Sequence, residues 1–174
     1  HVMAHMLTLG RRVEYHAQTV AEGRWGASPD FCYWDYPQVE FYQRVLGIVG
    51  LGRIGAAVAR AAQGLGMEVL AHEPAAVSIP DGVTMVAMDE VFSKSDVVSL
   101  HCPLSEQTQG IIQRKTLAQM KPGAMLINTS RGGLVVEDDL LESLRRGHLL
   151  GAGLDVFQQE PPDAANPLFQ LENV

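Results

Sequence analysis

The chain has 174 residues, of which 47% are hydrophobic and 19% are charged. This length and composition fit one globular domain with a sizeable core rather than two full domains. The net charge of -7 gives no long-range attraction to nucleic acid or to anionic lipid, and no apolar run reaches the roughly 20 residues of a membrane span. A small-molecule partner is therefore the better expectation.

The cysteines and the start of the chain indicate its setting. Cys32 and Cys102 are the only cysteines, and no positively charged leader with an apolar segment precedes the first predicted helix. Free thiols and a reducing, cytoplasmic location are therefore expected. Helical spacing of apolar residues is already in register at Val2, so we expect the chain to be a fragment of a longer polypeptide.

The first 44 residues predict a helix followed by an aromatic loop. Apolar residues from Val2 to Val20 recur at steps of three and four, which predicts one helix over residues 1–22. Within this loop of residues 23–44, the segment 28–43 holds six of the chain's eleven aromatic residues and two prolines that prevent a long helix. Such a loop covers a surface, either on its own domain or in a contact with another domain or subunit.

Residues 45–160 alternate between strand and helix patterns. The predicted strands are 45–49, 67–72, 83–86, 96–101, 124–128 and 149–157, and the predicted helices are 53–65, 88–95, 114–120 and 137–147. Apolar runs separated by helical segments predict an α/β fold with a doubly wound parallel sheet. Residues 161–174 form a C-terminal segment that we expect to lead to a missing strand and a substrate domain.

A glycine-rich turn, GLGRIG, lies between the first predicted strand and the helix that follows it. Its glycines are Gly50, Gly52 and Gly55, with Arg53 and Ile54 between the last two. In this context the first glycine permits a tight turn, the second lets a pyrophosphate approach the backbone, and the third lets helix and strand pack closely. Unpaired N–H groups at the helix start then face the anion.

An acidic residue completes this motif. Glu73 follows Gly55 by 18 residues, at the tip of the next strand. There a carboxylate accepts hydrogen bonds from the adenosine ribose and repels a 2′-phosphate, which favours NAD over NADP. The alternative is a glycine-rich turn with Glu73 as an ordinary surface acid.

Other strand ends are expected to line the same crevice, because ligands of open α/β sheets lie beyond the carboxyl ends of the strands. This rule adds His101, Cys102, Pro103 and Thr108, then Thr129, Ser130 and Arg131, then Asp155. The guanidinium fork of Arg131 matches a carboxylate, although a solvated loop arginine is the ordinary alternative. His101 is either a half-buried structural imidazole or a base. No metal site is predicted.

Essentially the whole chain resembles the cofactor domain of the D-isomer-specific 2-hydroxyacid dehydrogenases. The matching segments, in order, are GLGRIG, LHCPLSEQT, INTSRGGLVVEDDLLESL, GAGLDVFQQEPP and NPLFQLENV. GRW followed by SPDFCYWDYP is most similar to the glycerate dehydrogenase and hydroxypyruvate reductase subgroup. The resemblance implies a Rossmann-like domain that binds NAD, hydride transfer to or from a small D-2-hydroxy or 2-keto acid, and a homodimer formed through the first helix and the following loop.

The resemblance also implies roles for single residues. Arg131 pairs with the substrate carboxylate, Glu160 hydrogen-bonds a catalytic histidine, and Asp155 holds the nicotinamide carboxamide. Taken alone, Glu160 would be a solvated loop acid. The family's histidine is expected just past Val174, and its substrate domain lies outside this region, so we expect the chain to bind cofactor but to be inactive alone.

The sequence differs from the family pattern at two places, and two alternative functions are also compatible with it. Glu73 stands where many relatives have aspartate, and residues 41–44 replace a turn that commonly contains glycine, which puts the packing of this entry loop in doubt. The chain could instead be a nicotinamide-sensing regulatory module that resembles the transcriptional corepressors related to these enzymes. A purely structural dimerisation module is the other possibility, but it leaves the glycine motif and Glu73 unexplained.

Overall fold

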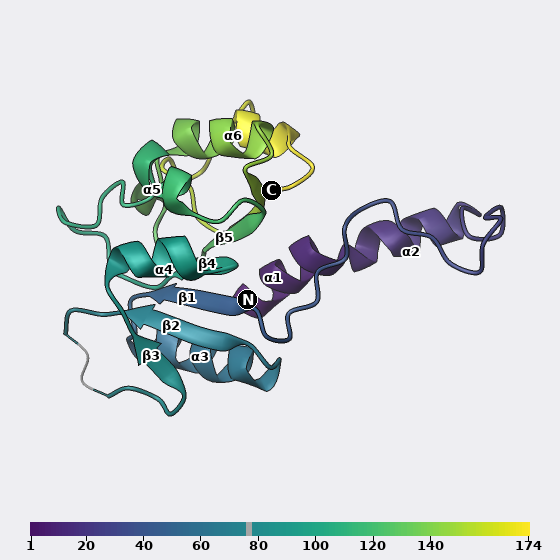
Figure 1. The fold of residues 1–174 in the computed structure, drawn as a ribbon. Coiled ribbons are helices and arrows are strands. Elements are labelled where there is room, and N and C mark those ends of the chain that lie inside the picture. Colours follow the sequence, from purple (N-terminus) through teal and green to yellow (C-terminus); the bar gives the residue numbers. More distant parts are fainter. Residues whose placement is uncertain (76–77) are drawn as a thin grey trace.

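One parallel sheet forms the centre of the molecule (Figure 1). The computed structural model describes residues 1–75 and 78–174. Its strands are β1 (Val45–Val49), β2 (Glu68–His72), β3 (Val83–Met85), β4 (Val97–Leu100), β5 (Ala124–Asn128) and β6 (Leu149–Leu154), in the spatial order β3-β2-β1-β4-β5-β6. The chain winds outward in both directions from the centre of the sheet, which confirms the predicted doubly wound α/β fold.

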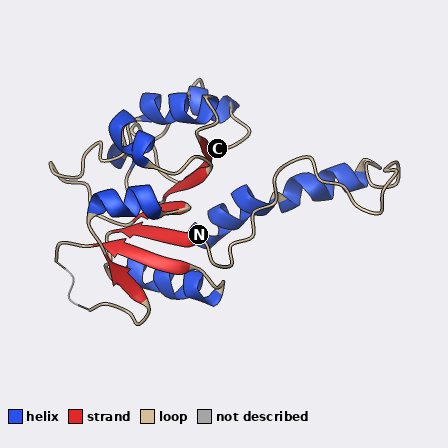
Figure 2. Ribbon diagram, in the orientation of Figure 1, coloured by secondary structure: helices blue, strands red, loops and turns tan. Residues whose placement is uncertain are grey.

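Helices cover both faces of this sheet (Figure 2). On one face lie α1 (Val2–Arg11) and α3 (Arg53–Gly64), and on the other lie α4 (Met88–Lys94), α5 (Arg114–Gln119) and α6 (Glu137–Arg145). Short 3-10 turns occur at Gly132–Leu134 and Pro167–Gln170. Within the described ranges, no helix is long and apolar enough to cross a membrane.

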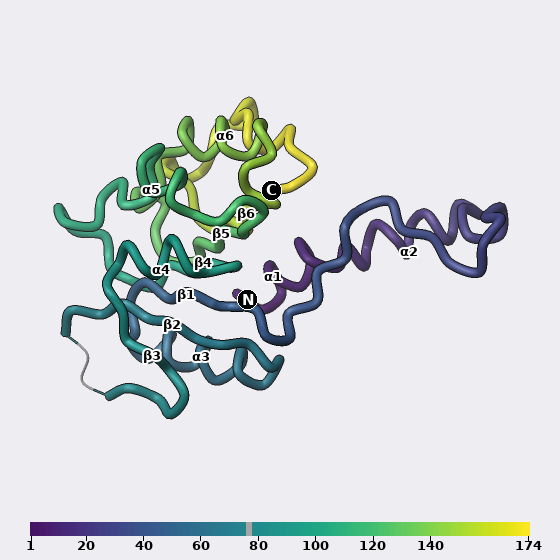
Figure 3. Tube along the Cα trace, in the orientation of Figure 1, coloured from purple at the N-terminus to yellow at the C-terminus, as the bar shows by residue number. Residues whose placement is uncertain are grey.

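The single helix expected over residues 1–22 is wrong. The structure has two helices, α1 and α2 (Val13–Ala21), separated at Arg12, which adopts a left-handed backbone with φ 43°. The break lets α1 pack against β5 and β6 while α2 leads away from the sheet (Figure 3). The Arg12 guanidinium lies over the Tyr36 ring, 4.1 Å from its centroid.

The aromatic segment after α2 returns along that helix, and the two together form a projecting arm (residues 13–38; Figure 3). Asp35 anchors the return, because its carboxylate accepts a 2.9 Å hydrogen bond from the Tyr15 hydroxyl and pairs with Arg24 at 2.8 Å. All of α2 is described, and none of its residues is buried. The arm therefore carries apolar side chains into solvent, with Phe31 90% and Trp34 66% exposed.

Residues 41–44, which lack the glycine common in this entry loop, form a packed turn before β1. Phe41 is buried against Gly10, where any side chain would collide with the ring. Gln43 adopts φ 61°, the left-handed conformation for which glycine is usually needed, and its N–H donates to the Gly66 carbonyl at 2.9 Å. The turn keeps its geometry without a glycine.

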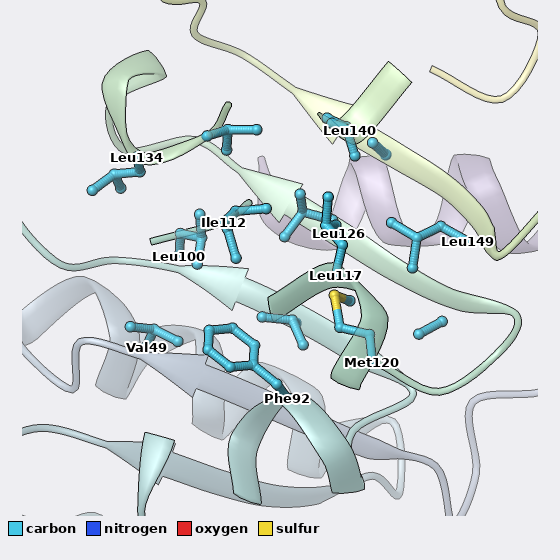
Figure 4. Close-up of a cluster of buried hydrophobic side chains, with 14 of the residues drawn as sticks. Val49, Phe92, Leu100, Ile112, Leu117, Met120, Leu126, Leu134, Leu140 and Leu149 are labelled. Atoms are coloured by element: carbon cyan, nitrogen blue, oxygen red, sulfur yellow. The ribbon is translucent and has the colours of Figure 1, made fainter. Parts of the chain in front are cut away.

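Two apolar layers hold the sheet, as expected for strands buried on both faces. Leu46 and Ile48 of β1 pack in the layer under α1 and α3, and Met125 of β5 joins them. Leu126 packs on the opposite side with Phe92 of α4, in the layer shown in Figure 4. The alternation fixes the register of each strand, and so the positions of the residues that follow it.

Candidate functional site

All strands are parallel, so the residues that follow them meet along one edge of the sheet. The glycine turn follows β1, and Glu73, His101, Thr129 and Asp155 follow β2, β4, β5 and β6 respectively. The winding direction changes between β1 and β4, which is the position where open α/β sheets form their ligand crevice. The sequence-predicted site residues near this position therefore belong to one region of the molecule.

The three glycines of the turn have different local surroundings. Gly50 has φ 100°, and a side chain there would collide with the backbone of Cys102 after β4. A side chain at Gly55 would collide with the Gly50 carbonyl, which keeps α3 close to β1. At Gly52, by contrast, a Cβ would meet no atom of the described residues within 4 Å. This open position at the start of α3 fits a diphosphate that approaches the backbone.

A cleft of about 710 Å³ lies beside this turn. It is lined by Leu51, Gly52, Arg53, Ala56, Arg60, Glu73, Ala75, Ser78 and Pro80. Arg53 and Arg60 have exposed side chains, and neither is in an ion pair with any described residue. The cleft therefore offers two free cations and helix N–H groups to an anion, and one carboxylate for a neutral hydroxyl partner. The predicted cofactor residue Ile54 does not line this cleft; it is 69% exposed and lines a separate pocket with His1 and Val2.

Glu73 is held in place by the backbone. Its Oε2 accepts from the Leu51 N–H at 3.2 Å, and its Oε1 accepts from the Ala75 N–H at 3.0 Å. Each carboxylate oxygen has two lone pairs, so both oxygens can still accept a bond from a ribose hydroxyl. The Glu73 carboxylate therefore reaches the glycine turn itself.

His101 is a neutral imidazole near the same turn. Burial lowers its pKa to about 4, and its Nε2 lies 2.8 Å from the Oγ of the buried Ser99. A general base works best with a pKa near the operating pH. This environment favours the structural role for His101 over the catalytic one.

Buried hydrogen bonds connect the end of β5 to the end of β4. The Ser130 hydroxyl donates to the Cys102 carbonyl at 2.8 Å, and the buried Asn128 side chain accepts from the Ser130 N–H at 3.1 Å. Asn128 also donates to the Arg131 carbonyl at 2.9 Å. Burial raises the pKa of the Cys102 thiol, and the Glu73 carboxylate raises it further, so this thiol stays protonated. Thr129 lies in the middle of this rigid turn.

The same turn presents Arg131 to solvent. Its guanidinium donates to the Ser130 carbonyl at 2.6 Å and has no carboxylate partner among the described residues. Gly132 lies directly against the Phe157 carbonyl, where no side chain would fit. The loop after β6 is thereby placed beside Arg131, and in that loop Glu160 accepts from the Phe157 N–H at 3.1 Å. The two predicted catalytic residues therefore lie on adjoining loops.

Pro103 and Thr108 belong to a self-contained loop after β4. The Thr108 hydroxyl donates to the Pro103 carbonyl at 2.6 Å and accepts from the Ser105 N–H at 2.8 Å. Its hydroxyl is thus engaged within the loop. Asp155, at the opposite end of the edge, is exposed, and its Oδ1 lies 3.1 Å from the Nε2 of His1. Neither group borders the cleft beside Glu73.

Sequence reasoning missed three contributors to this site. Asn128 and Ser99 organise the strand ends through buried hydrogen bonds, and the Leu51 N–H fixes Glu73. A polar residue at the end of an otherwise apolar strand was the available signal for Asn128. The contact between Leu51 and Glu73 joins two separate strand ends and has no local signal.

Comparison with known proteins gives one consistent answer. Residues 3–174 match the family model described as D-isomer specific 2-hydroxyacid dehydrogenase, NAD binding domain. The chain is 43% identical to a hydroxypyruvate reductase of Blautia hydrogenotrophica, over 98% of this chain and 54% of that protein. It is also 43% identical to a glycerate dehydrogenase of Methylorubrum extorquens, over 97% of this chain and 52% of that protein.

A solved structure agrees in three dimensions. The crystal structure of the TT0316 protein from Thermus thermophilus matches with a TM-score of 0.86 and 40% identity, over 99% of this chain and 53% of that one. The chain thus spans about half the length of the curated relatives it matches. The matches cover the glycine turn, the strand ends and the fold that carries them. The chain belongs to the D-isomer-specific 2-hydroxyacid dehydrogenase family, as its NAD-binding domain.

Proposed function

We propose that the complete protein transfers a hydride between NAD(H) and C2 of a small D-2-hydroxy or 2-keto acid. The observation that carries this proposal is the cleft in which the open Gly52 position and the backbone-held Glu73 face the same space. Hydroxypyruvate reductase and glycerate dehydrogenase, the names of two relatives, support a substrate of this size and charge.

Different residues of this chain bind the cofactor and the substrate. The N–H groups at the start of α3 and the Arg53 guanidinium bind the diphosphate, and Glu73 accepts from the adenosine ribose. When bound, NAD supplies the hydride acceptor, which no side chain provides. Arg131 binds the substrate carboxylate through its planar fork and attracts electron density at the C2 oxygen. Asp155 accepts from the nicotinamide carboxamide.

Proton transfer needs a group that this chain supports but does not contain. The resemblance places a histidine beyond Val174, and Glu160 would accept from its ring and stabilise the protonated form. That histidine takes the hydroxyl proton in oxidation and returns it in reduction. The low pKa of His101 supports this assignment, because a histidine with a pKa of about 4 is a poor substitute.

The test is calorimetric titration of the chain with NADH and with NADPH. We expect NADH to bind more tightly, because the Glu73 carboxylate repels a 2′-phosphate. Glu73→Gln removes the charge, keeps the shape, and should reduce the preference for NADH. Binding of neither cofactor, or a preference for NADPH, contradicts the proposal. Turnover of hydroxypyruvate or glyoxylate by the complete protein distinguishes an enzyme from a regulatory module.

The assembly proposed is a homodimer formed through the cofactor domains. Its support is the projecting arm, whose exposed Phe31 and Trp34 need a cover that a single chain does not supply. A substrate domain, built from sequence on both sides of residues 1–174, would complete each subunit. Nucleic acid and membranes are not proposed as partners.

Location in a reducing cytoplasm is part of the same proposal. Cys32 and Cys102 are both free thiols within the described residues. Cys102 is buried beside the cofactor cleft, where it acts as a small apolar side chain.

A further inference from the structure

Two histidines and an aspartate converge at the start of α1. The Nε2 of His5 lies 3.2 Å from the Nε2 of His1, which in turn lies 3.1 Å from the Oδ1 of Asp155. One ligand atom from each residue lies within 4.8 Å of the other two. The imidazole rings are perpendicular, with centroids 4.7 Å apart. Sequence reasoning predicted no metal site, although these histidines have the four-residue spacing that places two ligands on one helix face.

The position of His5 is set by packing. Helix α1 lies across β5 and β6, and its buried Met6 belongs to the apolar layer beneath it. The His5 ring lies against Gly153 of β6, where a Cβ would come within 2.6 Å of the His5 Cβ. Since Asp155 follows the same strand, the ring and the carboxylate are held at one corner of the sheet.

Two of the three separations in the cluster match those of neighbouring ligands around one small cation. Zn²⁺ binds imidazole nitrogen and carboxylate oxygen at about 2.0–2.1 Å, so neighbouring ligands of a tetrahedral site are about 3.3 Å apart. The separations of His1 from His5 and from Asp155, 3.2 and 3.1 Å, are close to this value, and His5 and Asp155 lie within 4.8 Å of each other. Two imidazoles and one carboxylate also form a donor set that zinc commonly uses.

Hydrogen bonding alone satisfies this cluster poorly. Neutral His1 carries at most one proton on Nε2, and that proton would have to serve both the His5 nitrogen and the Asp155 oxygen. If Nε2 accepts from His5 instead, its lone pair faces a carboxylate. A cation placed between the three atoms removes this conflict.

The surroundings leave room for a fourth ligand. A cavity of about 540 Å³ borders the cluster, lined by His1, His5, Thr8, Leu154 and neighbouring residues of α1, β6 and the C-terminal segment. We infer that His1, His5 and Asp155 bind a divalent transition-metal ion of the zinc class, with water in the remaining position. If the proposed function is correct, Asp155 also serves the nicotinamide, so metal and cofactor compete for it.

The experiment titrates the chain with Zn²⁺ by calorimetry and with Co²⁺ by visible absorption, without cofactor. At least one residue should precede His1, so that no free amino group there adds a ligand. We expect one ion per chain and the intense visible bands of tetrahedral Co²⁺. His5→Gln and Asp155→Asn should each weaken binding about tenfold or more. His16→Gln on α2 is the matched control and should bind normally.

Absence of the tetrahedral bands, or Zn²⁺ affinity that His5→Gln leaves unchanged, overturns the metal site whether or not the chain binds NADH. Circular dichroism of each variant checks that α1 has formed. A second titration measures NADH affinity with and without Zn²⁺. We expect Zn²⁺ to weaken NADH binding in the native chain but not in His5→Gln, and equal effects in both would overturn the competition.

Discussion

At the scale of single residues, two glycines of the same turn have opposite constraints. Gly52 has φ -76° and open space where a Cβ would lie. Alanine adopts this backbone without strain. We therefore expect Gly52→Ala to keep the unfolding temperature of the native chain while its Cβ occupies the space that the diphosphate needs. NADH affinity, measured by calorimetry, should fall about tenfold or more, a loss of about 1.4 kcal/mol.

Gly50→Ala is the matched comparison for this variant. Its φ of 100° and its contact with the Cys102 backbone should lower the free energy of unfolding by about 2 kcal/mol or more. Denaturant titration of both variants separates the two effects. If Gly52→Ala lowered the free energy of unfolding as much as Gly50→Ala, Gly52 would be required for folding rather than for binding the diphosphate.

His101 makes stability depend on pH. Its folded-state pKa of about 4 is below the 6.5 of an unfolded histidine. Between these values the unfolded chain binds a proton that the folded chain does not, so stability is greatest above pH 6.5 and falls as the pH drops toward 4. The decrease attributable to this residue is on the order of 3 kcal/mol.

The measurement is the free energy of unfolding from pH 7.5 to pH 4 for the native chain and His101→Gln. The glutamine variant should lose less stability over this range, because it has no group to protonate. Parallel curves would mean that His101 is protonated equally in both states. Carboxylates titrate in both proteins and cancel in the difference.

At the scale of elements, the arm is stabilised mainly by its own contacts. The contacts of Asp35 with Arg24 and Tyr15 hold the returning loop against α2. Phe31 and Trp34 stay exposed. The double variant Phe31→Ser, Trp34→Ser should therefore keep the unfolding temperature of the isolated subunit and weaken dimerisation. Sedimentation equilibrium should show the dimer dissociation constant rising about 30-fold or more, as for the loss of a residue that dominates an interface.

Ile79→Ser is the control for the arm, since Ile79 is a half-exposed apolar residue elsewhere. It should leave the dimer intact. If the native chain is already a monomer at high concentration, or if the double variant dimerises normally, the arm is not the interface.

At the scale of the whole molecule, the division between cofactor and substrate edges is testable in the complete protein. Arg131 lies on a turn held by Asn128 and Ser130, away from the cleft beside Glu73. Arg131→Ala should lower turnover about 100-fold or more, because the substrate carboxylate loses its charged partner, with NADH affinity unchanged. Arg131→Lys keeps the charge but not the fork and should recover part of the activity. Parallel losses of turnover and NADH binding would show that the arginine serves the cofactor.

How far the sequence predicted this molecule depends on the range of the interactions involved. The strands, the glycine turn and the helix at Arg53 follow from local patterns, and the parallel sheet then places Glu73, Arg131 and Asp155 on one edge. The helix break at Arg12 was not predicted, because the helical spacing of apolar residues continues through this position. Only the packing of α1 against the sheet requires the break. The Asn128 bonds and the cluster of His1 with Asp155 join distant parts of the chain, and such contacts leave no periodic signal.

The absence of a side chain at Gly132 affects how the loops after β5 and β6 are held together. Because Gly132 lets the backbone of the β6 loop rest against the β5 loop, the two segments touch without an intervening flexible group. We therefore expect the cation at 131 and the acid at 160 to keep their spacing, because the backbones of the segments that carry them are in direct contact.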